Sequence, residues 1–92
     1  MFILGTVSQS YNNLAVLYQE KGQLEKAIQQ ITKAIQKNPN TASFYRNRGL
    51  MWKQQNKLDK AIKDLEKASR LYQNQGKPQA AKAINETLNQ LR

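Results

Sequence analysis

The sequence repeats itself with a period of 34 residues, and this period constrains the fold more than any other feature. Residues 11 to 18 read YNNLAVLY and residues 45 to 52 read YRNRGLMW, with an aromatic residue at each end and a small residue at the fifth place. The matches continue along the chain, where Leu24, Lys26, Ala27, Ile28, Ile31 and Ala34 correspond to Leu58, Lys60, Ala61, Ile62, Leu65 and Ala68. So many matches at one shift indicate a tandem repeat.

Each copy is predicted to form a helical hairpin. Its apolar residues recur three and four positions apart, which is typical of helices. Gly22 divides the first copy and Asn56 stands at the same place in the second, and both residue types tolerate the left-handed conformation that ends a helix. Pro39 stops the second helix, and Asn40 or Thr41 can cap the third. The predicted helices cover residues 8–21, 24–37, 42–55, 58–74 and 78–91, with Pro78 near the start of the fifth.

This pattern resembles the tetratricopeptide repeat, which reads W-x2-L-G-x2-Y, then A-x3-F, then P. The first copy matches at Tyr11, Leu14, Ala15, Tyr18, Ala27, Ile31 and Pro39, and the second at Tyr45, Gly49, Trp52, Ala61 and Leu65. The second copy departs at Arg48, where leucine is expected, and at Gln73, where proline is expected. The resemblance implies an all-α fold, a right-handed helix-turn-helix solenoid of five helices.

The resemblance also divides the chain into segments. Residues 8–41 form repeat 1, residues 42–75 form repeat 2 with an extended second helix, and residues 76–92 form a capping helix. Residues 1–7 are an apolar segment, which we expect to be disordered, docked on the first helix, or in contact with a second copy of the chain. The stretch YQNQG at 72–76 echoes YQEKG at 18–22, so the tail has a second interpretation as a degenerate third hairpin that shares its first helix with repeat 2.

The amino-acid composition argues against catalysis and metal binding. The chain has no histidine and no cysteine, so it lacks the usual general base, the thiol nucleophile and the best ligands for zinc. Its six acidic residues are not grouped like a calcium loop, and we expect them to be solvated. The sequence therefore predicts a protein that is not an enzyme and needs no cofactor or metal.

No targeting segment is visible at the start of the chain. The stretch MFILGTV lacks a positively charged region, and its apolar run is too short for a signal peptide or a membrane span. A cytoplasmic location and the absence of a transmembrane segment are the resulting expectations.

The aromatic and arginine residues of YRNRGLMW suggest a nucleic-acid site at first sight, but helical geometry argues otherwise. Tyr45, Gly49 and Trp52 share one side of a helix, whereas Arg46 projects about 100 degrees away. We predict that Tyr11, Tyr18, Tyr45 and Trp52 belong to the core, and that Gly49 marks a close crossing of two helices. Bases would then have no platform on which to stack.

The resemblance implies that the first helix of each repeat lines a concave groove. The predicted peptide-binding residues are Asn12, Asn13, Val16, Arg46, Asn47, Leu50 and Lys53, and Gln9, Gln19 and Ser43 lie on the same face. Asn13 and Asn47 occupy the same place in each repeat and are suited to hold a peptide backbone, because a carboxamide both donates and accepts. Arg46 and Lys53 favour a carboxylate. The alternative is that these are ordinary solvated surface residues.

Some members of the family clamp the C-terminal carboxylate of chaperones, with lysine and asparagine on early helices and a lysine-arginine pair on a third repeat. This chain departs from that arrangement, because Asn12 stands where the first lysine would be and no complete third repeat follows. At Arg48 we expect the aliphatic stem to pack and the charged head to extend into solvent.

The chain carries a formal net charge of +9, and four of its cations follow one another on the fourth predicted helix. Lys60, Lys63, Lys67 and Arg70 recur three and four residues apart and are predicted to form a basic stripe on the convex face. Asp59 with Lys63 and Glu66 with Arg70 have the spacing of helical ion pairs, which would neutralise part of the stripe.

Three hypotheses follow. The preferred one is a protein-interaction module that binds a peptide of acidic character in the concave groove. The second is a nucleic-acid or anionic-surface binder that uses the basic stripe. The third is a structural piece of a longer repeat array, or a unit that self-associates, because two hairpins with a cap fall short of the usual three repeats.

Overall fold

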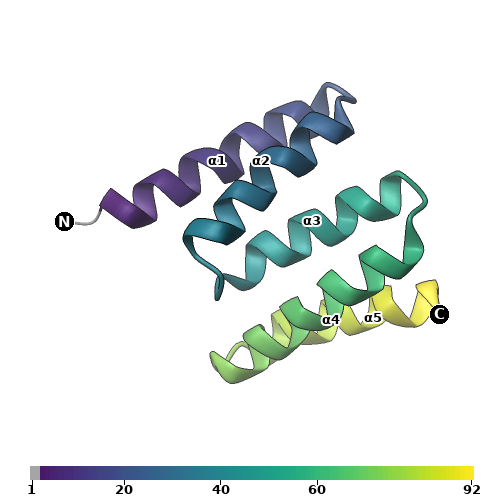
Figure 1. Ribbon diagram of the computed structural model, residues 1–92. Coiled ribbons are helices and arrows are strands. Elements are labelled where there is room, and N and C mark those ends of the chain that lie inside the picture. The colour runs from purple at the N-terminus through teal and green to yellow at the C-terminus, as the bar shows by residue number, and fades with distance from the viewer. Residues whose placement is uncertain (1–2) are drawn as a thin grey trace.

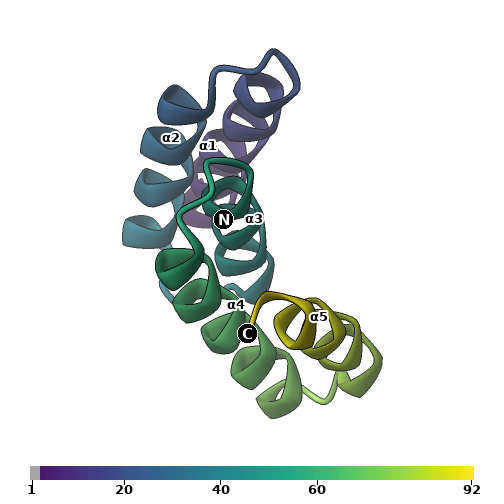
Figure 2. The same cartoon turned by 90° about the vertical axis from the view of Figure 1, so that its right-hand side faces the viewer.

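The computed structural model describes the backbone of residues 3–92 and the side chains of residues 7–92. The described chain forms five helices: α1 (Ile3–Glu20), α2 (Leu24–Lys37), α3 (Ala42–Gln54), α4 (Leu58–Asn74) and α5 (Pro78–Leu91) (Figure 1). Figure 2 shows them along an arc, with α2 and α4 on its outer side and α1, α3 and α5 on its inner side. The predicted all-α solenoid of five helices is confirmed.

Four of the five helices lie within one residue of their predicted bounds, and α1 is the exception. It begins at Ile3 instead of residue 8, so the backbone of residues 3–7 continues the first helix and does not form a separate segment. The predicted docking or self-contact of the first apolar side chains concerns residues whose side chains lie outside the described part.

The turns after α1, α3 and α4 share one backbone geometry. Gly22, Asn56 and Gly76 have φ angles of 79°, 62° and 73°, in the left-handed region. In each turn the next N–H donates to the carbonyl five residues earlier, at 2.9 Å for Gln23 to Tyr18, 2.9 Å for Lys57 to Trp52 and 2.8 Å for Lys77 to Tyr72. The echo of YQEKG in YQNQG is therefore also a structural equivalence.

The absence of proline at Gln73 has the predicted effect on helix length. Helix α4 has 17 residues, whereas the equivalent α2 has 14 and ends just before Asn38 and Pro39. Pro78 occupies the first turn of α5, as predicted. Thr41 stands at the N-cap of α3, but its carbonyl and not its hydroxyl accepts the N–H of Phe44. Side-chain capping by Thr41 is therefore not observed.

Small residues on facing helices set the distance between the helices of each hairpin. Ala15, Ala27 and Ala61 are fully buried. A Cβ placed on Gly49 would lie 2.8 Å from Cγ of Leu65, closer than packed carbon atoms approach. The predicted close crossing at Gly49 is confirmed.

The core consists of two clusters that share α3. Phe44 and Met51 join the first cluster, which otherwise comes from α1 and α2, whereas Ala42 joins the second cluster with α4 and α5. The remaining members of the first cluster are Ala15, Ala27, Ile28, Ile31, Ala34 and Ile35, and those of the second are Leu65, Ala68, Tyr72, Ala81, Ile84 and Leu88. Helix α3 therefore links the two repeats.

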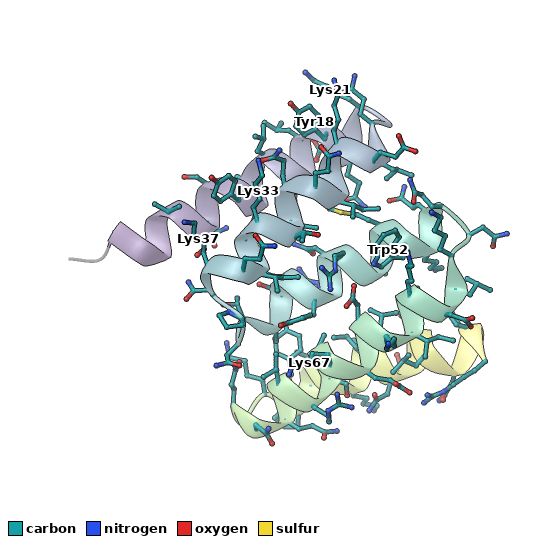
Figure 3. All side chains as sticks on the ribbon, in the orientation of Figure 1. Tyr18, Lys21, Lys33, Lys37, Trp52 and Lys67 are labelled. Carbon is teal, nitrogen blue, oxygen red and sulfur yellow. The ribbon has the colours of Figure 1, made fainter. Side chains whose placement is uncertain are left out.

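The four predicted core aromatics lie at the rim of the core instead of inside it. Tyr11, Tyr18, Tyr45 and Trp52 pack against the first cluster but remain partly exposed. A lysine ammonium lies over each ring, at centroid distances of 5.8 Å (Lys33 on Tyr11), 5.8 Å (Lys26 on Tyr18), 5.7 Å (Lys67 on Tyr45) and 4.6 Å (Lys60 on Trp52). One member of each pair, Lys33, Tyr18, Lys67 or Trp52, is labelled in Figure 3. The rings are thus covered by the chain's own lysines.

The two ends of the helix array differ in polarity. On α1, Leu17 is 53% exposed, although the equivalent Met51 in repeat 2 is fully buried against the first cluster. On α5, the outward side chains of Gln79, Lys82 and Glu86 are polar and exposed. The exposed side of α5 is therefore polar, whereas that of α1 carries a large apolar side chain.

Candidate functional site

Two classes of site receive no support from the described residues. The sequence has no histidine or cysteine, so its acidic side chains are the only usual metal ligands that it contains. Among the described residues, no three or more of them are grouped to hold a metal ion. Within residues 3–92, no helix is long and apolar enough to cross a membrane.

On the inner face, a chain of hydrogen bonds joins α1 to α3. The amide nitrogen of Asn47 donates to the amide oxygen of Asn12 at 2.9 Å. In turn, the Asn47 oxygen accepts from Nη2 of Arg46 at 3.1 Å and from Nε at 3.3 Å. The Asn47 carboxamide is therefore held in one orientation from both sides.

Contrary to the prediction, Asn12 does not lie open in the groove. It is only 8% exposed, because α3 covers it and its oxygen is bonded to Asn47. Asn13 is exposed on the surface of α1, where its oxygen accepts a hydrogen bond from Gln9 at 3.1 Å. The two asparagines predicted as an equivalent pair, Asn13 and Asn47, thus have different surroundings.

A second feature lies further along the same two helices. A pocket of about 450 Å³ is lined by Leu50, Lys53 and Gln54 from α3 and by Gln19 and Glu20 from α1. Gln19 donates to Gln54 across it. Leu50 is partly buried against the second core cluster, Val16 is partly buried, and Lys53 is exposed. Leu50 and Lys53 therefore line one pocket, to which Glu20 adds a carboxylate that was not predicted.

Contrary to the expectation, the charged head of Arg48 does not extend into solvent. Its Nε and Nη2 donate to the two carboxylate oxygens of Asp64 at 2.7 Å and 3.0 Å, and its Nη1 donates to Thr32 at 3.2 Å. The indole N–H of Trp52 also donates to Asp64, at 3.1 Å. Asp64 is 7% exposed, so the expectation that all acidic residues are solvated is wrong for this one.

The sequence held a signal for this network. At the positions equivalent to Arg48 and Asp64, repeat 1 has Leu14 and Gln30, so an apolar residue and an amide have both become charged, with opposite signs. Two linked changes of this kind, sixteen residues apart on facing helices, point to an ion pair.

The same network affects Tyr45. Burial raises the pKa of the Tyr45 hydroxyl, the nearby Arg48 guanidinium offsets part of this rise, and Asp64 adds to it. The hydroxyl donates to the carbonyl of Pro39 at 2.7 Å. Tyr45 therefore keeps its proton above the ordinary tyrosine range.

Of the four residues of the predicted basic stripe on α4, Lys60, Lys63 and Arg70 are exposed and Lys67 is partly buried. The stripe borders a pocket of about 540 Å³ between α3 and α4, whose other lining residues are Tyr45, Arg48, Trp52, Asp64 and Glu66. The predicted ion pairs within α4 are not formed. Among the described side chains, the ion pairs are Arg48 with Asp64 and Arg92 with Glu66 at 2.7 Å.

Family models for the tetratricopeptide repeat match residues 8–41 and residues 42–75. The chain belongs to the tetratricopeptide repeat family. These matches have the predicted repeat bounds, and α5 follows them as a further helix. Tetratricopeptide repeats are in general protein-interaction modules, and at that level of description this chain is one.

Solved tetratricopeptide structures share the fold. The N-terminal domain of stress-induced protein-1 (STI-1) from C. elegans has a TM-score of 0.78 at 17% identity, covering 99% of this chain and 80% of its own. The second TPR of Spaghetti (RPAP3), bound to the HSP90 peptide SRMEEVD, has a TM-score of 0.69 at 22% identity, covering 96% and 94%. MamA has a TM-score of 0.67 at 21% identity, covering 95% of this chain and 55% of its own. No curated protein matches the chain.

Proposed function

We propose that this tetratricopeptide chain binds an extended, acidic peptide segment of a partner protein along the inner face of α1 and α3. The site binds its peptide without chemical conversion. The peptide contacts Asn13, Arg46, Asn47 and Lys53, with Val16 and Leu50 as the apolar part of the site. Asn12 orients Asn47 through the hydrogen bond between their amides.

The fixed carboxamide of Asn47 is the observation that carries this proposal. Its hydrogen bonds use one of its two N–H donors, to Asn12, and both lone pairs of its oxygen, which accept from Nη2 and Nε of Arg46. The remaining N–H donor suits a C=O group of an extended backbone. Because the side chain is already immobilised, a peptide would lose less conformational entropy on binding.

Two cations on α3 favour acidic side chains in the peptide. Arg46 and Lys53 are exposed and seven residues apart, which is about 10 Å along a helix. An extended chain advances by about 3.3 Å per residue and its side chains alternate between two faces, so carboxylates two residues apart face α3 together, about 7 Å from each other, within reach of the long side chains of Arg46 and Lys53. The second glutamate and the final aspartate of SRMEEVD, the peptide bound to the Spaghetti TPRs, have this separation.

The test is a titration of the labelled chain with SRMEEVD, followed by NMR amide shifts at physiological salt. We expect shifts at Asn13, Arg46, Asn47 and Lys53, and a weaker affinity after Asn47→Ala. A peptide in which all three acidic residues are amides should bind more weakly, because it lacks the carboxylates that pair with Arg46 and Lys53.

A charge-matched pair of variants provides the control. Arg46→Gln with Lys53→Gln should reduce the affinity, whereas Lys37→Gln with Lys82→Gln, which removes the same charge from exposed positions elsewhere, should not. Equal losses in both double variants, or shifts confined to α4, would contradict an inner-face site.

A further inference from the structure

We propose that the outer-face pocket between α3 and α4 is a second binding site, which takes an acidic helical segment of a partner protein. It is separate from the inner-face site, because none of its lining residues, which come from α3 and α4, is a proposed inner-face contact. Two of them, Trp52 and Lys67, are labelled in Figure 3.

Repeat 1 shows that the fold itself does not require these charges. At the positions equivalent to Lys63, Glu66 and Arg70, repeat 1 has the neutral Gln29, Thr32 and Gln36. Helices α1 and α2 nevertheless pack together as α3 and α4 do, with Ala27 and Ala34 buried at the places of Ala61 and Ala68, and Ile31 at the place of Leu65. The charges of repeat 2 therefore need an explanation other than folding.

Lys63 and Arg70 are not neutralised by the chain. Neither makes an ion pair within the described residues, where Glu66 pairs with Arg92 and Asp64 pairs with Arg48. Lys60 and Lys67 are held over the rings of Trp52 and Tyr45, so their ammonium groups are already positioned at the pocket wall. The pocket thus presents these four cations, and two of them lie over its aromatic rings.

The spacing of the cations matches an acidic helix. Lys60 and Lys67 are seven residues apart, as are Lys63 and Arg70, and each pair spans two helical turns, or about 10 Å. A helix lying along α4 with glutamates three and four residues apart would present carboxylates at the same intervals. The basic stripe and the acidic helix would then form ion pairs along their whole length.

Two observations favour such a segment over nucleic acid. The faces of Tyr45 and Trp52 are covered by lysines, so bases have no free ring on which to stack. The carboxylates of Asp64 and Glu66 also line the pocket, and they would repel a continuous phosphate backbone. A protein segment can place its carboxylates beside the cations and avoid these two acids.

The chain carries its own probe of this site, because its single tryptophan, Trp52, lies in the pocket. The experiment titrates a synthetic helical peptide with glutamates at three- and four-residue spacing and follows Trp52 fluorescence at physiological salt. The comparison peptide has the same composition with its glutamates in a different order. We expect saturable binding of the first peptide, weaker binding of the second, and loss of affinity as salt rises.

The variants use the residues that repeat 1 has at the same positions. Lys63→Gln with Arg70→Gln should weaken binding about tenfold. Lys37→Gln with Lys82→Gln removes the same charge and should leave the affinity within about twofold, as should Arg46→Gln with Lys53→Gln in the inner-face site. Circular dichroism melting checks that each variant is folded.

Three results would contradict the proposal of a second site. They are equal affinity for the two peptides, equal weakening in the charge-matched variants, and displacement of the peptide by a single-stranded oligonucleotide at a lower concentration. The last result would assign the pocket to nucleic acid. Each outcome leaves the inner-face proposal to be judged on its own titration, since that site responds to Arg46 and Lys53.

Discussion

At the scale of single residues, Arg48 and Asp64 are the clearest departure from the family pattern. A partly buried arginine stands where the family has leucine, and it is bonded through all three guanidinium nitrogens to Asp64 and Thr32. The pair joins α2, α3 and α4 in one polar network. A charge desolvated in this way is stabilising only while its partner is present.

We predict that Arg48→Leu destabilises the chain by about 1–3 kcal/mol, because Asp64 remains buried with the Trp52 N–H as its remaining donor. The double variant Arg48→Leu with Asp64→Gln reproduces the pair found in repeat 1, Leu14 and Gln30, and should recover most of this loss. Urea unfolding of the single and double variants measures both quantities. A single variant as stable as the wild type would show that the network contributes nothing.

Tyr45 gives a prediction about pH. Because burial raises its pKa in the folded chain, the unfolded tyrosine, with a pKa of 10.0, ionises first as the pH rises. The stability that depends on its proton is complete below pH 10 and is lost as the pH rises from there through the folded-state pKa. Tyr45→Phe should therefore lose less stability between pH 8 and about pH 10.5 than the wild type. Tyr11→Phe, which retains Tyr45, should behave like the wild type.

At the scale of helices, local signals were sufficient for most of the fold. Gly22, Asn56 and the proline at position 78 are stop and start signals that act within a few residues, so the bounds of α2 to α5 could be predicted. No such signal stands before residue 8, and the start of α1 was missed. The inner-face site was predicted less completely, because the burial of Asn12 depends on how closely α3 approaches α1.

The turns between helices give the prediction at this scale. Asn56 pays a steric penalty in the left-handed region that glycine avoids, so Asn56→Gly should stabilise the chain by about 0.5–1 kcal/mol. Gly22→Ala should destabilise it by about 1 kcal/mol, although an added Cβ would meet no atom within 4 Å. Thermal unfolding of the two variants should shift in opposite directions. Equal shifts would mean that the turn conformation is not retained.

At the scale of the whole molecule, the two repeats are alike in sequence but unequal in burial. Position 51 is covered by the repeat before it, whereas the equivalent Leu17 has no described helix packed over it and is 53% exposed. Met51→Gln should therefore cost about 2–4 kcal/mol, since it buries an amide without a partner, while Leu17→Gln should change stability by less than about 0.5 kcal/mol. Chemical denaturation compares them directly. A large loss in Leu17→Gln would indicate that this face is covered in solution, for example by a second copy.

The packing of each helix chiefly on its neighbours in the chain has a kinetic consequence. Most contacts close short loops, so little entropy is lost before they form, and chains of this kind fold within microseconds to milliseconds. Because α3 belongs to both core clusters, either hairpin can form first, and the other hairpin can then fold and pack against it. Folding would then follow two parallel routes that meet at α3, and substitutions in Phe44 or Met51 would slow the joining of the halves more than the formation of either one.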